Sequence, residues 1–322
     1  MKALVQHVYG AADSLTFEDV PDPVPADGEV LVRMRATSVN PYDWHFMRGE
    51  PYVARLMPGG FGLRPPRAAI LGCDLAGRVE TAGASLRPGD DVYALLPHGA
   101  YAEYVCVRED LLAPMPANLT HEQAAAMPMA AVTALLALRG VEAGQRVLVN
   151  GASGGVGTFA VQLAKALGAQ VDAVCGAANA GLARSLGAEH VVDYRSADFT
   201  RGGRSYDFVL DIAGSRSLPA CRRAVRPDGT FVVVGGQAGR WLQPAGHAFA
   251  ALAAGPFVRR RAVLADAVGC QDKKAVLAEL AALVERGALT PVIDRSYPFD
   301  DLRAAIAYQE AGHAKGKVVV TR

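Results

Sequence analysis

The pattern of apolar and polar residues changes character about a third of the way along the chain. Before residue 118, short apolar or alternating stretches such as 29–36, 92–96 and 101–105 are interrupted by turns rich in glycine, proline and aspartate. This pattern predicts a compact β-rich domain. Beyond it, strand-like and helical stretches alternate, which is typical of a parallel sheet with helices on both faces. The patterning therefore predicts an α/β protein.

The second region opens with a capping-box signature, in which Thr120 is followed by Gln123. Its predicted strands are 146–150, 170–175, 191–194, 207–212, 230–234 and 262–268, and its predicted helices are 156–167 and 179–186. An amphipathic helix over 273–286 and a strand at 318–320 then return to the character of the first region. We therefore expect one domain from 1–121 and 269–322, and a second from 122–268.

Composition narrows the class of protein. The 322 residues carry a formal net charge of +1, with 51% hydrophobic and 20% charged residues, which suits a globular protein of two domains. A net charge near zero argues against a dedicated nucleic-acid binder. The five cysteines are far apart, which excludes a zinc ribbon and argues against a disulfide scaffold.

Hydrophobic stretches in the chain are too short for a membrane span. The longest strongly apolar uncharged run, 124–138, has 15 residues, fewer than the ~20 that a bilayer requires. The N-terminal residues lack the apolar core of a signal peptide. We expect a cytoplasmic protein without a membrane segment.

A glycine-rich loop between a predicted strand and a predicted helix is the first candidate site. Small residues let the backbone approach a pyrophosphate, and the N–H groups of the helix end favour its charge. Ala replaces the first glycine of the usual fingerprint, but the strand before it and the helix after it support dinucleotide binding. The candidate residues are Ala152, Ser153, Gly154, Gly155, Val156 and Gly157.

The same loop fits a competing function. Residues 151–155 also match G-x-S-x-G, the nucleophile elbow of α/β hydrolases, with Ser153 as nucleophile. The downstream histidines that such a site needs are present at His190, His247 and His313. However, the elbow explains neither Gly157 nor the β-rich first region. A serine hydrolase is therefore the weaker alternative.

Cofactor choice depends on the end of the second predicted strand. An acidic residue there would hold the ribose 2′-hydroxyl of NAD, but the chain has Cys175 and Gly176. Tyr194 and Arg195, after the next strand, are candidates to reach a 2′-phosphate, although ordinary strand-end and surface roles suit them equally. The pattern favours NADPH, with NADH possible.

Ordered motifs along nearly the whole chain resemble the medium-chain dehydrogenase/reductase superfamily, in its zinc-independent quinone oxidoreductase branch. They are Met1-Lys2-Ala3, residues 38–43, residues 72–77 with Cys73 and Asp74, residues 88–92, Thr133-Ala134, the glycine loop, residues 187–194 and residues 316–319 with Lys317. The resemblance implies a GroES-like β-rich catalytic domain and a Rossmann-type, doubly wound cofactor domain.

The resemblance also implies a reaction without zinc. Members that hold catalytic zinc have cysteine and histidine ligands where this chain has Asn40, Cys73 and Asp74. One thiol and one carboxylate do not make a tetrahedral zinc site. The implied reaction is hydride transfer from NADPH to an already electrophilic acceptor, such as a quinone or an α,β-unsaturated carbonyl (enone or enoyl) compound.

By resemblance, Asn40 and Thr133 line the nicotinamide end of the site, and Tyr52 lines the acceptor pocket. Tyr52 either donates a proton or forms an apolar wall while water supplies the proton. Gly-rich and Pro-rich segments 50–67, with Tyr52 and Phe61, and 241–258, with Trp241, are expected to shape that pocket. Gly214, Gly235 and Gly236 are expected at strand ends near the nicotinamide. Lys317 is a candidate phosphate contact, with a surface lysine as the alternative.

Two further expectations concern function without catalysis and assembly. The branch includes NADPH-binding sensor or structural proteins, some of which touch nucleic acid, but the basic clusters 222–223 and 259–261 are more typical of solvated surfaces. The stretch 262–265 is expected to be the edge strand of the parallel sheet. Because an edge strand exposes unpaired backbone groups, we expect a homodimer through this edge, with a monomer guarded by the arginines as the alternative.

Overall fold

The structure is a computed structural model that describes residues 1–322 except 57–60, 64–68, 237–238, 242–260 and 265–266. It divides into two compact units: unit 1 with residues 1–50, 54–132 and 268–322, and unit 2 with residues 51–53 and 133–267. Residues 122–132, which the sequence assigns to the second domain, group with unit 1, because α2 (His121–Ala125) packs on β3 (Glu29–Val39) and β5 (Asp74–Val79).

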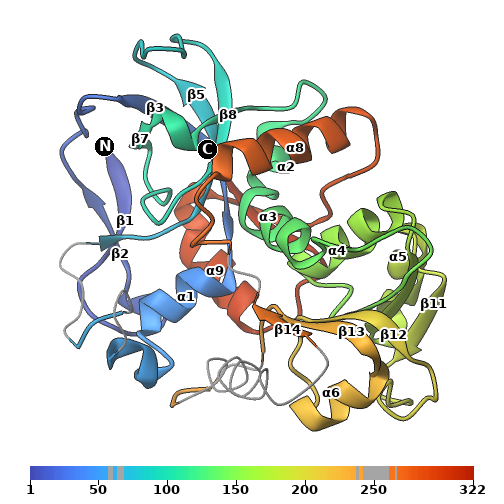
Figure 1. Ribbon diagram of the computed structural model, residues 1–322. Helices are drawn as coiled ribbons and strands as arrows, with labels where there is room; N and C mark the ends of the chain where they lie inside the picture. Colours follow the sequence, from blue (N-terminus) through green and yellow to red (C-terminus); the bar gives the residue numbers. More distant parts are fainter. Residues whose placement is uncertain (57–60, 64–68, 237–238, 242–260, 265–266) are drawn as a thin grey trace. The chain divides into compact units, whose positions relative to one another are not determined.

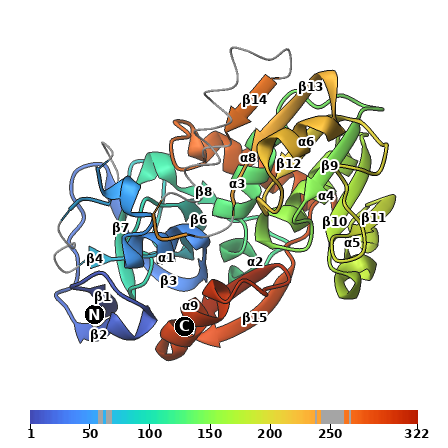
Figure 2. The same ribbon diagram turned by 90° about the horizontal axis from the view of Figure 1, so that it is seen from below.

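A seven-stranded sheet forms the core of unit 1. Its order is β15-β16-β3-β5-β6-β8, and β7 also pairs with β3. The remaining strands are β6 (Asp91–Leu95), β7 (Tyr104–Arg108), β8 (Ala113–Pro114), β15 (Ile293–Pro298) and β16 (Lys317–Thr321). Because β16 pairs antiparallel with the end of β3, the C-terminal segment completes the first sheet, as the sequence predicts. Both chain ends lie in this unit (Figure 2).

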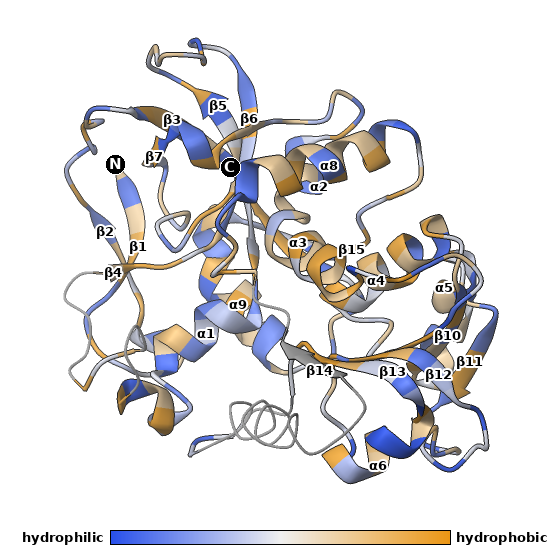
Figure 3. Ribbon diagram, in the orientation of Figure 1, coloured by the Kyte–Doolittle hydropathy of each residue, from blue (hydrophilic) through white to orange (hydrophobic). Residues whose placement is uncertain are grey.

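Among the described residues, unit 1 also contains a small sheet and several helices. The sheet has the order β2-β1-β4, with strands β1 (Lys2–Gln6), β2 (Thr16–Asp19) and β4 (Ala69–Ile70). Besides α2, the helices are α1 (Pro41–Arg48), α8 (Lys273–Glu285) and α9 (Leu302–Glu310). Figure 3 shows hydrophobic and hydrophilic residues alternating along α8. Its leucines face the core while its charges face solvent, as the predicted amphipathic helix requires.

Unit 2 is built on a parallel sheet of six strands in the order β11-β10-β9-β12-β13-β14. They are β9 (Arg146–Asn150), β10 (Gln170–Cys175), β11 (His190–Asp193), β12 (Tyr206–Asp211), β13 (Val225–Val233) and β14 (Arg261–Leu264). The helices α4 (Gly155–Ala166) and α5 (Ala180–Ser185) lie on one face and α6 (Leu218–Ala224) on the other (Figure 1). This order is that of a doubly wound Rossmann sheet, which confirms the predicted fold.

Local sequence explains how the chain passes from unit 1 to unit 2. Thr120 and Gln123 form the predicted capping box at the start of α2. The next helix, α3 (Pro128–Ala137), is hydrophobic along its whole length (Figure 3) and buried over residues 129–135. A helix that is apolar on every side must be covered all round. The helix therefore lies in the interior and carries Thr133 there.

Candidate functional site

The glycine loop of unit 2 joins β9 to α4, where the sequence places it. Gly154 is the N-cap of α4 and Gly155 its first residue, so the N–H groups of the first helical turn point toward the loop. A Cβ on Gly157 would lie 2.1 Å from the Gly151 oxygen and 2.7 Å from the Cα of Ala152. Only glycine therefore allows α4 to pack this closely, which is the role of the third glycine in a dinucleotide site.

Ser153 lies at the tip of the loop and has a polar partner. The Asn179 amide donates to its Oγ at 3.1 Å. A serine nucleophile needs a histidine within hydrogen-bond reach. Among the residues that the structure describes, no histidine forms a hydrogen bond with Ser153. His247, one of the predicted candidates, lies outside the described residues. This arrangement suits a phosphate loop better than a nucleophile elbow.

The end of β10 carries the residues predicted to select the cofactor. The strand ends at Cys175, and a Cβ on Gly176 would lie 3.6 Å from the Tyr194 ring. The Arg195 guanidinium lies 5.7 Å from the centre of that ring. A feature missed in the sequence is Asp193, which is paired with Cys175 across the sheet. Its carboxylate accepts from the Arg195 N–H and thereby closes its own turn.

The carboxyl ends of β9 and β12 are joined by a second polar group that sequence reasoning missed. The Asn150 amide donates to buried Asp211 at 2.7 Å, and the N–H of Gly214 donates to the same oxygen at 2.9 Å. A Cβ on Gly235 would lie 2.8 Å from the Ile212 carbonyl oxygen. Asp211 thus fixes the turn of Gly214, while Gly235 is required by close backbone packing. Gly236 follows it and is half-buried.

Unit 1 contains a buried ion pair beneath Asn40. The Lys317 ammonium donates to the Asn40 Oδ1 at 2.5 Å and to the Asp74 Oδ2 at 3.1 Å, and Lys317 is only 3% exposed. The Asn40 amide nitrogen donates to Asp74 at 3.0 Å, and the Ser38 hydroxyl donates to the same oxygen. The interpretation of Lys317 as a surface lysine is therefore wrong. Its predicted contact with a phosphate stays a prediction.

A second buried carboxyl, Asp43, lies three residues after Asn40. Its Oδ2 accepts from the Asn40 N–H at 2.8 Å and closes the capping box of α1. Burial, with a further contribution from the charge of Asp74, raises the pKa of Asp43 to about 6. The Tyr101 hydroxyl and the Cys73 thiol favour the charged form, but they do not offset burial. The carboxyl is mainly structural, as an N-cap partner.

Asp43 also lines a partly enclosed cavity of about 220 Å³ within unit 1. Aromatic rings make up much of its wall. The lining residues are Gln6, Tyr9, Tyr42, Asp43, Phe46, Phe61, Ala69, Leu71, Gly72, Cys73, Pro97 and His98. The rings of Phe46 and Phe61 meet edge to face at 4.7 Å. Phe61 belongs to one of the two segments expected to shape the acceptor pocket.

Tyr52 and Trp241 lie in unit 2, and residues 242–258 of the second segment lie outside the described residues. The Tyr52 N–H donates to the Arg240 carbonyl at 2.7 Å, and its ring meets Trp241 edge to face at 5.2 Å. Trp241 is 76% exposed. Thr133, in contrast, is buried on α3. The structure therefore shows why Tyr52 groups with unit 2, and its role in proton transfer stays a prediction.

Comparison with known proteins decides the family. Residues 26–117 match the alcohol dehydrogenase GroES-like domain, and residues 186–320 match the family described as zinc-binding dehydrogenase. A mitochondrial NAD(P)H oxidoreductase of Bos taurus is 32% identical, over 99% of this chain and 89% of that protein. A chloroplast envelope quinone oxidoreductase homolog of Arabidopsis thaliana is also 32% identical, over 99% and 98%. The chain belongs to the medium-chain dehydrogenase/reductase superfamily.

Solved structures place this superfamily member in the quinone oxidoreductase branch. The quinone oxidoreductase of Coxiella burnetii matches with a TM-score of 0.86 at 28% identity, over 100% of this chain and 99% of that one. A mycobacterial protein solved with NADPH matches with a TM-score of 0.84 at 26% identity, over the whole of both chains. The predicted family and its two-domain fold are thereby confirmed.

The residues of this superfamily member do not fit a catalytic zinc. Among the described residues, no three or more histidine, cysteine, aspartate or glutamate side chains gather where they could share a metal ion. At the positions implied by the zinc-containing members, Asn40 and Asp74 are both bonded to the Lys317 ammonium. Burial raises the pKa of the Cys73 thiol well above its usual value, which opposes the thiolate that zinc requires.

The described helices also bear on the membrane prediction. None of those in the described ranges is both long and apolar enough to cross a bilayer.

Proposed function

We propose that this protein transfers a hydride from NADPH to a quinone or an α,β-unsaturated carbonyl compound. NADPH, when bound, supplies the hydride, and a proton completes the two-electron reduction of the acceptor. The observation that carries the proposal is the glycine loop, where Gly157 lies so close to Gly151 that no side chain fits. The names of the quinone and NAD(P)H oxidoreductase relatives support the same reaction.

In this proposal, unit 2 is the dinucleotide-binding domain and unit 1 the acceptor domain. The loop from Ala152 to Gly157 holds the pyrophosphate against the N-terminus of α4. Gly214, Gly235 and Gly236 lie at the ends of β12 and β13 and leave room for the nicotinamide ribose. The donors and small residues present therefore fit a dinucleotide.

NADPH is the proposed cofactor because the end of β10 carries no carboxylate to repel a 2′-phosphate. Gly176 and the Tyr194 ring lie side by side there, and Arg195 lies next to that ring. Tyr194 is 45% exposed, so its hydroxyl is accessible to a phosphate. Asp193 is the one nearby carboxylate that argues for NADH, but its oxygens are used in its own turn.

The acceptor is proposed to bind in the aromatic cavity of unit 1. Flat, unsaturated rings pack well against Tyr42, Phe46 and Phe61. The cavity volume of about 220 Å³ suits a small ring compound. Asn40 lies at the start of α1, which also supplies Tyr42, Asp43 and Phe46.

Asn40, Thr133 and Tyr52 are the proposed residues of the reaction centre. Lys317 is less suited to a cofactor phosphate, because its ammonium would have to leave Asp74 buried and unpaired. For Tyr52, the contact with Trp241 supports a pocket wall. A Tyr52→Phe variant that retains turnover identifies water as the proton source.

Assembly and location are part of the proposal. β14 is the edge strand of the unit 2 sheet and pairs with β13 on one side, so its other side is available to a second copy. We propose a homodimer through β14, which light scattering at assay concentration tests. We also propose a cytoplasmic location. The mitochondrial and chloroplast relatives make fractionation the direct check.

The test of function is NADPH oxidation by the purified protein with simple quinones and enones, compared with NADH. Gly176→Asp is the matched variant, because a carboxylate beside Tyr194 repels the 2′-phosphate and favours the ribose 2′-hydroxyl of NADH. We expect turnover with NADPH in the wild type and a shift toward NADH in the variant. Chelator is expected to leave activity unchanged.

Two outcomes contradict parts of the proposal. Tight NADPH binding without turnover of any acceptor indicates the non-catalytic sensor or structural alternative. Covalent labelling of Ser153 by a fluorophosphonate probe revives the hydrolase alternative.

A further inference from the structure

The amide of Asn40 has only one orientation that its neighbours accept. Lys317 can only donate a hydrogen bond, and it contacts the amide oxygen at 2.5 Å. An ionised Asp74 can only accept, and it contacts the amide nitrogen at 3.0 Å. Turning the amide over would place donor against donor and acceptor against acceptor. Asn40 is 2% exposed, so water does not relieve such a mismatch.

Asp74 connects this amide to the helix that carries Thr133. One carboxylate oxygen accepts from Ser38, Asn40 and Lys317, and the other accepts from the N–H of Met129 at 2.7 Å. Met129 lies in the first turn of α3, and Thr133 follows four residues later on the same face of that helix. One carboxylate therefore fixes both the Asn40 amide and the start of α3.

One hydrogen of the Asn40 amide has no acceptor among the described residues. The amide nitrogen carries two hydrogens, and within the described ranges its one acceptor is Asp74. A positive charge on the amide oxygen draws electron density from the nitrogen, so the remaining N–H becomes a stronger donor. The chemistry that matches such a donor is a carbonyl oxygen, and the nicotinamide carboxamide and a quinone or enone acceptor both present one.

We propose that Asp74 and Lys317 are positioning residues that lock and polarise the Asn40 amide so that its free N–H donates to a ligand carbonyl. This inference rests on the proposed hydride transfer. Stability alone is a weak explanation for the pair, because a buried ion pair is often no more stabilising than apolar side chains of similar size. The contribution of this buried ion pair is instead to fix the orientation of the Asn40 amide.

The test removes the Asp74–Lys317 ion pair in two backgrounds, one with Asn40 intact and one with Asn40→Ala. The double variant Asp74→Asn/Lys317→Met leaves no unpaired charge, so it is expected to fold where a single variant fails. In the wild-type background we expect kcat/KM to fall about tenfold or more, since small errors in orientation are costly to catalysis. In an Asn40→Ala background the same removal should change kcat/KM by less than about twofold. Arg48→Met/Glu310→Gln, which removes another ion pair of unit 1, is the control.

The kinetic and binding results of these variants either support or overturn the positioning role of Asp74 and Lys317. A higher Kd for NADPH in the double variant assigns the carbonyl to the cofactor, and a higher KM for the quinone assigns it to the acceptor. Equal losses in both backgrounds, or a loss matched by the control, overturn the proposal. If the wild type turns over no acceptor, the proposed function fails independently. The Asn40 side-chain amide signals in nuclear magnetic resonance spectra then decide, because positioning predicts that they shift in the double variant.

Discussion

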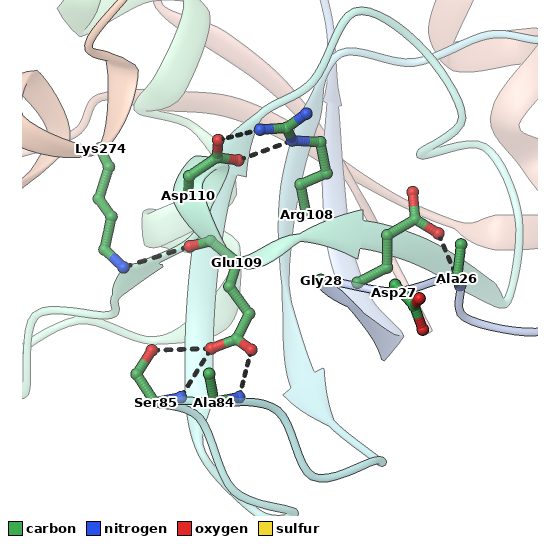
Figure 4. A pocket seen from close by; sticks show the side chains of 10 residues that line it. Ala26, Asp27, Gly28, Ala84, Ser85, Arg108, Glu109, Asp110 and Lys274 are labelled. Atoms are coloured by element: carbon green, nitrogen blue, oxygen red, sulfur yellow. Dashed lines mark hydrogen bonds and ion pairs between the residues drawn. The ribbon is translucent and has the colours of Figure 1, made fainter.

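Two hollows in unit 1 differ in their surroundings, and one carboxyl group from each, Asp43 and Glu109, shows the contrast. The cavity beside α1 is the more enclosed of the two and is lined by aromatic rings, and its Asp43 is 2% exposed. The other hollow, of about 660 Å³, is wide and open and contains Glu109 (Figure 4). Glu109 accepts from the Ser85 N–H at 2.9 Å, from the Ser85 hydroxyl at 2.7 Å and from the Ala84 N–H. These hydrogen bonds lower the pKa of Glu109 to about 2.

The contrast separates the proposed acceptor cavity from a more open hollow of greater volume. In the open hollow, several charged groups already have partners: Arg108 pairs with Asp110, and Lys274 donates to the Glu109 carbonyl (Figure 4). In the enclosed cavity, apolar rings are open to a ligand and the one carboxyl has its pKa raised by burial. Our proposal therefore places the acceptor in the smaller of the two hollows.

The largest expected effect is on how stability depends on pH. The folded-state pKa of Asp43, about 6, lies above its unfolded value of about 4, so the folded protein binds the proton more tightly. Compared with Asp43→Asn, the wild type should lose up to about 3 kcal/mol of unfolding free energy as pH rises from about 3 to about 7. Urea unfolding of both proteins across this range measures the loss.

For Glu109, the dependence of stability on pH has the opposite sign, and the variant Glu109→Gln reveals it. Because the pKa of Glu109 is lowered to about 2 in the folded state, its contribution is present above about pH 4.5 and is lost as pH falls. Wild type and Glu109→Gln should therefore diverge as pH increases from 3 to 5. Slopes of the same sign for both carboxyls would show that the two hollows do not differ as described.

The second prediction concerns variants that place a phenylalanine side chain in each hollow. Ala69 lines the enclosed cavity, and Ala69→Phe should lower kcat/KM for the quinone about 10- to 100-fold, as expected from about 1–3 kcal/mol of overpacking. The Kd of NADPH should stay unchanged, because the glycine loop is in unit 2. Ala84→Phe in the open hollow is the matched control and should have wild-type kinetics. Normal quinone turnover by Ala69→Phe excludes this cavity as the acceptor site.

The parts of the fold that could be predicted from sequence are those with local signals. Strands β9 and β10 have the predicted bounds, because apolar runs closed by glycines leave little choice of register. The glycine loop was predictable for the same reason. The contact that requires glycine at position 157 is with Gly151, only six residues earlier in the sequence. By resemblance, the family and its cofactor followed from motifs in a fixed order.

The parts that could not be predicted depend on contacts between distant residues. Helix α1 was missed because its eight residues begin with Pro41 and show no clear helical period, and its capping box needs the backbone in place. Lys317 follows a glycine near the end of the chain, a position at which an exposed lysine is expected. Its burial depends on Asp74, 243 residues earlier in the sequence. No local pattern reveals such a pair.

The smallest expected effects concern the partners of each carboxyl. Tyr101→Phe removes a hydroxyl that favours the charged form of Asp43, so the pKa of Asp43 should rise further above its usual value. Ser85→Ala removes one of three donors to Glu109, so the pKa of Glu109 should rise from about 2 but stay below its usual value, because the Ala84 and Ser85 N–H groups still donate. Carbon-13 nuclear magnetic resonance titration of the two carboxyls measures both shifts. A pKa of Glu109 unchanged by Ser85→Ala would mean that the backbone alone holds this carboxylate, and a lowered pKa of Asp43 in Tyr101→Phe would mean that water has entered the cavity in place of the hydroxyl.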